Sequence, residues 1–75
     1  MARILVIEDD DQLNVTLCEV LRKTEQTVRA VKSKEEALRA LADDEYDLIL
    51  TNTASGHQLA RIADAYETKL LLIRR

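Results

Sequence analysis

The 75-residue sequence contains no proline, tryptophan or phenylalanine, and only one glycine and one cysteine. Because Cys18 has no second thiol to pair with, the chain cannot be a small scaffold held by internal disulfides. Hydrophobic residues make up 47% of the sequence and charged residues 33%, which also argues against a disordered or collagen-like chain. The length allows one folding unit, so we predict a single domain over residues 1–75.

An excess of positive charge and long apolar runs are lacking as well. Eleven lysines and arginines face 14 acidic residues, for a net charge of −3, which disfavours binding to the phosphate backbone of nucleic acids. The longest apolar runs, residues 4–7 and 70–73, fall far short of the roughly 20 residues that span a bilayer. Glu8 interrupts the first run too early for a signal peptide. We therefore expect a soluble, cytoplasmic protein with no nucleic-acid and no membrane partner.

Four short segments are predicted to be β-strands. The run at residues 4–7 is rich in β-branched residues and does not alternate with polar ones, which is typical of a strand buried on both faces of a parallel sheet. Residues 48–51 are predicted to be another buried strand, and the apolar run at residues 70–73 a fourth strand. Residues 27–31 mix apolar and polar side chains, as expected near the edge of a sheet.

The segments between these strands have helical spacing of apolar residues. The first helix is predicted over about residues 11–23, with Asp10 or Asp11 as its cap. Ser33 followed by Glu36 indicates a capping box at the start of the second helix. Residues 52–56 have turn composition and precede the third helix. The predicted apolar faces of the three helices are Leu13, Leu17, Val20 and Leu21; Ala37, Leu38 and Leu41; and Leu59, Ile62, Ala63 and Tyr66.

This alternation of strands and helices predicts an α/β fold of the order β-α-β-α-β-α-β. Short connections and right-handed crossovers then require an open parallel sheet with helices on both faces. Ligands of such sheets bind beyond the carboxyl ends of the strands. Two segments lie there, residues 8–11 and the segment that starts at Asn52. The acidic residues 8–11 suit Mg²⁺, but they suit ordinary helix capping about equally well.

Residues 3–10 and 46–52 together resemble the receiver domain of two-component response regulators. The resemblance covers nearly the whole chain, but only the first four of the five β-α units of the family. It implies a flavodoxin-like sheet in the strand order 2-1-3-4, a histidine kinase as partner and a role in phosphorelay signalling. It also places Glu8 and Asp9 on the acidic pair that holds Mg²⁺. Asn52 falls where the family has the aspartate that accepts phosphate.

Asn52 changes the chemistry that the resemblance implies. A neutral carboxamide is a poor nucleophile and adds no charge to a metal site, so we expect no phosphorylation at this position and at most a weak Mg²⁺ site at Glu8 and Asp9. A structural role as a turn cap is the simpler interpretation of Asn52. Arg74 falls where the family has a hydroxyl residue. These departures predict a truncated, degenerate pseudo-receiver that is not an enzyme.

Without a fifth unit, residues 70–73 would form an exposed apolar strand at the edge of the sheet. Such an edge favours pairing with another chain, and we predict a homodimer in which this strand pairs antiparallel with its symmetry mate. The predicted interface consists of Leu70, Leu71, Leu72 and Ile73, with Arg74 and Arg75 at its rim. Two alternatives stay open: a working phosphoacceptor that uses Asp9 or Asp10 with Mg²⁺, and an excised fragment of a longer response regulator.

Overall fold

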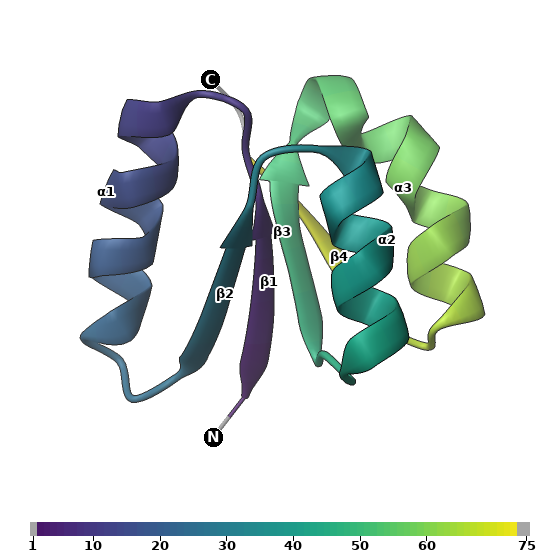
Figure 1. The fold of residues 1–75 in the computed structure, drawn as a ribbon, viewed down its shortest axis with the longest axis horizontal. Helices are drawn as coiled ribbons and strands as arrows, with labels where there is room; N and C mark the ends of the chain where they lie inside the picture. Colours follow the sequence, from purple (N-terminus) through teal and green to yellow (C-terminus); the bar gives the residue numbers. More distant parts are fainter. Residues whose placement is uncertain (1, 74–75) are drawn as a thin grey trace.

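The computed structural model describes residues 2–73, without the side chains of residues 52–58, 72 and 73. The predicted order of strands and helices is confirmed (Figure 1). The elements are β1 (Arg3–Ile7), α1 (Asp11–Arg22), β2 (Thr27–Val31), α2 (Lys34–Asp43), β3 (Leu48–Asn52), α3 (Thr53–Ala65) and β4 (Lys69–Ile73). Arg74 and Arg75 lie outside the described residues.

The four strands form one sheet in the order β2-β1-β3-β4, and every neighbouring pair is parallel. This confirms the α/β fold with the strand order 2-1-3-4. β1 is central, with Ile7 in register with Val31 of β2 and Thr51 of β3. Within the described chain, β2 and β4 are therefore the two edge strands.

Helices cover both faces of the sheet, as predicted, but in unequal number. α1 lies on one face, and α2 and α3 lie on the other (Figure 1). Leu5 and Ile7 of β1 pack toward α2 and α3, whereas Ile4 and Val6 pack toward α1. Alternate residues of one strand thus serve two separate apolar clusters.

α1 begins and ends close to the predicted limits. Asp10 is its N-cap and accepts a hydrogen bond from the main-chain N–H of Leu13 at 2.9 Å. The helix ends at Arg22, one residue before the predicted end. The predicted apolar face is wrong at Val20, which is exposed, because the helix is rotated so that other residues face the sheet.

α2 begins as predicted. Ser33 is its N-cap, and its hydroxyl accepts a hydrogen bond from the main-chain N–H of Glu36 at 3.2 Å. Leu38 was expected on the buried face but is partly exposed, whereas Ala40 is completely buried. A small side chain there lets the helix approach the sheet closely.

The turn predicted at residues 52–56 is wrong, because β3 runs to Asn52 and α3 begins at Thr53. Threonine, serine and asparagine favour turns, but they are also the residues that favour helix starts. After α3, Glu67 adopts a left-handed conformation with φ 54°, and the main-chain N–H of Thr68 donates to the carbonyl of Ala63 at 2.8 Å. This reversal directs the chain into β4. Tyr66, expected on the inner face of α3, follows the helix and is exposed.

No helix among residues 2–73 combines the length and the apolar character needed to cross a membrane.

Candidate functional site

The two predicted site segments meet at the same edge of the sheet. β1 and β3 are parallel neighbours, with Ile7 in register with Thr51. Glu8 follows Ile7 and Asn52 follows Thr51. These two residues therefore lie side by side at the carboxyl ends of the strands. The side chain of Asn52 lies outside the described residues, so its predicted role as a cap stays a prediction.

Glu8 is buried and takes part in the local fold. Its carboxylate Oε1 accepts a hydrogen bond from the main-chain N–H of Asp10 at 3.1 Å. Its own main-chain N–H donates to the carbonyl of Val31 at 3.1 Å. These contacts fix the turn that leads from β1 into α1 and tie it to the end of β2.

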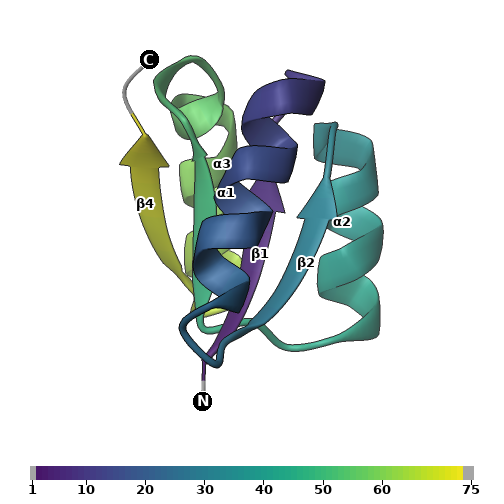
Figure 2. The same cartoon turned by 90° about the vertical axis from the view of Figure 1, so that its left-hand side faces the viewer.

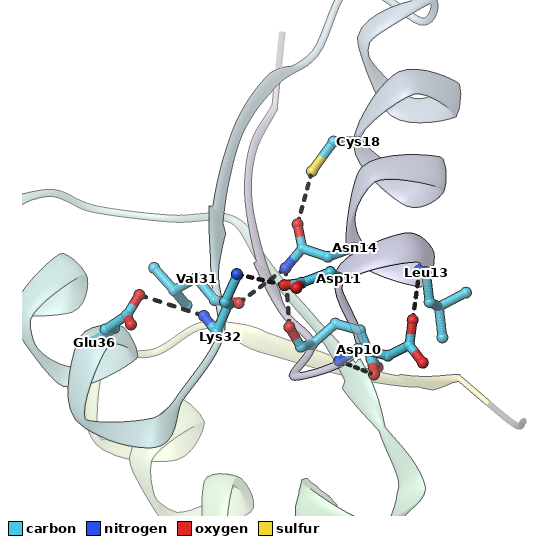
Figure 3. Close-up of polar contacts among 9 residues, drawn as sticks. Asp10, Asp11, Leu13, Asn14, Cys18, Val31, Lys32 and Glu36 are labelled. Carbon is cyan, nitrogen blue, oxygen red and sulfur yellow. Dashed lines mark hydrogen bonds and ion pairs between the residues drawn. The ribbon is translucent and has the colours of Figure 1, made fainter.

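Asn14 is a residue of this site that the sequence analysis missed. It lies on α1, is only 7% exposed, and its Nδ2 donates to the carbonyls of Glu8 at 3.0 Å and Val31 at 3.2 Å. Its Oδ1 accepts from the Cys18 thiol at a sulfur–oxygen distance of 3.6 Å. Figure 3 shows this amide between α1 and the end of β2. One side chain therefore holds three elements together.

A signal for Asn14 was present in the sequence. Asn14, Leu17, Cys18 and Leu21 follow the i, i+3, i+4, i+7 spacing of one helix face, and this is the face that packs on the sheet. A polar residue on such a face needs hydrogen-bond partners. The carbonyls of Glu8 and Val31, at the ends of neighbouring strands, supply them.

Lys32 follows β2 and reaches the acidic segment. Its ammonium group forms an ion pair with the carboxylate of Asp11 (Figure 3). The hydrogen bond to Asp11 and then the negative charge of Asp11 raise the pKa of Lys32 above its ordinary value, with a smaller contribution from Glu36. The main-chain N–H of Lys32 donates to Glu36 Oε2 at 3.4 Å. The acidic segment is thus paired with a cation of the chain itself.

At least three of the four carboxylates of this segment make contacts within the protein. Glu8 accepts from Asp10, Asp10 caps α1, and Asp11 pairs with Lys32. Among the side chains that the structure describes, which exclude those of residues 52–58, no group of three or more histidine, cysteine or acidic side chains is arranged to hold a metal ion. The weak Mg²⁺ site predicted at Glu8 and Asp9 stays a prediction.

A cleft of about 310 Å³ opens beside the acidic segment. It lies between the end of β1, the start of α2 and α3. It is lined by Ile7, Asp9, Lys32, Ser33, Lys34, Glu35 and Leu59. Asp9 and Lys32 therefore border the same space, and Asp9 is exposed to solvent.

The residues of the predicted interface at β4 differ in burial, and the interface itself stays a prediction. Leu70 is half-buried because it packs against the cluster beneath α2 and α3. Leu71 is 53% exposed, and its register with Leu50 places it on the face of α1. The side chains of Leu72 and Ile73 lie outside the described residues. Figure 2 shows β4 at the edge of the sheet with no described helix in front of it.

No protein-family model matches this sequence, and no curated protein is significantly similar to it. The resemblance to receiver domains therefore stays a prediction that rests on the quoted residues.

Proposed function

We propose that this chain is a cytoplasmic, non-catalytic receiver-like module of two-component signalling that works without phosphorylation and self-associates through β4. The residue that ends β3 carries this proposal. Asn52 lies at the carboxyl edge beside Glu8, where attack on a phosphohistidine would need a carboxylate. A carboxamide lacks the required nucleophilic oxygen. A histidine kinase or another two-component protein would then be a binding partner rather than a phosphate donor.

The acidic segment supports this proposal. Phosphoryl transfer depends on positive charge that neutralises the developing phosphate oxygens. In this chain Asp10 and Asp11 hold a helix N-terminus and a lysine instead. These two acidic side chains of the segment therefore have structural contacts, which supports a binding role over phosphoryl transfer.

Self-association through β4 is supported by the position and exposure of this strand. β4 pairs with β3 on one side, and no described strand lies on its other side. The half-exposed Leu71 adds apolar surface at the same edge. Strand pairing across a two-fold axis would extend the sheet and satisfy the open main-chain groups.

Sedimentation velocity at micromolar concentration tests this interface. The unmodified chain should sediment as a dimer, and Leu71→Lys should sediment as a monomer, because a charge at the edge opposes strand pairing. Val15→Lys is the matched control, since Val15 is 55% exposed and lies on α1, and this variant should remain a dimer. A compact monomer of the unmodified chain would show that β4 does not mediate self-association.

A phosphoacceptor role for Asp9 is the second candidate, because Asp9 borders the open cleft. Asp10 is less suited, since its carboxylate caps α1. Incubation with acetyl phosphate and Mg²⁺ followed by intact-mass measurement separates the two functions. We expect no phosphoryl adduct on the unmodified chain. An adduct that disappears in Asp9→Asn would replace the non-catalytic function with this one.

A further inference from the structure

We infer that Lys32 is the counter-cation of the acidic loop, residues 8–11, and that its charge opposes binding of divalent metal ions to this loop. This inference does not depend on self-association or on the fate of phosphate. It rests on how β1 and β2 bring the two charged segments together.

The sheet places the main chain of Lys32 beside the acidic loop. Ile7 is in register with Val31, and the main-chain N–H of Glu8 donates to the Val31 carbonyl. The next residue after Val31 is Lys32. Its main-chain N–H donates to the carboxylate of Glu36 on α2. The main chain at Val31 and Lys32 is therefore bonded to the end of β1 on one side and to α2 on the other.

The ammonium group of Lys32 is directed to the far end of the same loop. It forms the ion pair with Asp11 at the start of α1 (Figure 3). Lys32 also lines the cleft that Asp9 lines. The lysine thus contacts the acidic loop at Asp11 and borders the same cleft as Asp9.

A metal ion entering the loop would meet two obstacles. The carboxylates of Glu8 and Asp10 already accept hydrogen bonds from main-chain N–H groups, so coordination through those oxygens would compete with these bonds. The ion would also approach the positive charge of Lys32, and like charges a few ångströms apart repel even at the protein surface. Of these obstacles, the charge can be removed by substitution without altering the fold, because the Lys32 side chain is exposed.

Titration with Mn²⁺, followed by the loss of the free-ion EPR signal, tests the inference. Lys32→Gln should bind Mn²⁺ about three- to tenfold more tightly than the unmodified chain, from the loss of one nearby positive charge. Lys32→Arg keeps the charge and should retain the weak binding of the unmodified chain. Circular dichroism of each variant verifies that the fold is unchanged.

Lys34→Gln is the matched control. Lys34 borders the same cleft and its substitution removes the same formal charge, but Asp11 pairs with Lys32. We expect a change of less than about twofold for this variant, because the ion pair with the loop is made by Lys32 and not by Lys34. Equal affinities of Lys32→Gln and the unmodified chain, or equal gains in Lys32→Gln and Lys34→Gln, would overturn the inference.

Discussion

The two faces of the sheet differ in how their helices are held. The face under α2 and α3 has a cluster of nine buried residues, whereas the face under α1 has three. Large apolar side chains are exposed on both sides of the sheet: Val15 and Val20 on α1 and Leu71 on β4, and Leu38 on α2 and Tyr66 after α3. Apolar burial therefore stabilises α2 and α3 far more than α1.

On the α1 face, polar contacts hold the helix in addition to the smaller apolar cluster. Asp10 caps the helix, Asn14 bonds to the ends of β1 and β2, and Asp11 pairs with Lys32. All of these contacts gather at the carboxyl edge of the sheet, where ligands of this fold bind. The α2 and α3 face thus contributes most of the buried apolar surface, and the α1 face contributes polar groups of the candidate site.

Truncating one leucine on each face gives the largest expected effect. Leu5→Ala removes a completely buried side chain beneath α2 and α3 and should lower the free energy of unfolding by about 3–5 kcal/mol. Leu50→Ala on the α1 face should cost about 2–3 kcal/mol, because fewer neighbours surround it. Urea denaturation at one fixed protein concentration measures both. Equal costs would contradict the difference between the faces.

Removing the Asn14 amide should have an intermediate effect. Asn14→Ala leaves the Glu8 carbonyl without its side-chain donor and should lower the free energy of unfolding by about 1–3 kcal/mol. Hydrogen exchange should accelerate in α1 more than in α2, since the contact joins α1 to the sheet. Gln12→Ala, an exposed position on the same helix, is the control and should change little. Uniform acceleration in both helices would show that Asn14 does not act on α1 in particular.

The fold was predictable because its signals are local. The uninterrupted apolar run at residues 4–7 predicted a strand buried on both faces, and Ile4, Leu5, Val6 and Ile7 are all buried. Ser33 and Asp10 predicted helix starts, since an N-cap needs only the next three residues. The strand order came from the resemblance, not from these local signals, and the structure confirms it.

The candidate site was predictable only in part because its contacts join distant segments. The acidic loop was evident from Glu8 and Asp9, but its pairing with Lys32 depends on β2 ending beside β1. The role of Asn14 likewise depends on the Val31 carbonyl, which is 17 residues away in sequence. Turn composition at residues 52–56 was misleading, because the residue types that favour turns also favour helix starts.

The smallest predicted effect concerns a buried hydroxyl without a hydrogen-bond partner on the face beneath α2 and α3. Thr51 is buried beside Ile7, and its Oγ1 has no hydrogen-bond partner within the described structure. Thr51→Val replaces this hydroxyl with a methyl group of similar volume and should raise the free energy of unfolding by about 1 kcal/mol, because the cost of burying an unpaired polar group disappears. The shift in the urea midpoint measures it.

Thr68→Val is the matched comparison for this substitution. Thr68 is also buried, but its Oγ1 donates to the carbonyl of Tyr46 at 3.0 Å, so the same replacement should lower the free energy of unfolding by about 1 kcal/mol. If Thr51→Val raises the free energy of unfolding and Thr68→Val lowers it, the buried hydroxyl without a hydrogen-bond partner lies at the end of β3, next to Asn52. A loss of stability in both variants would instead mean that Thr51 has a hydrogen-bond partner in solution and that the α2 and α3 face has no such defect there.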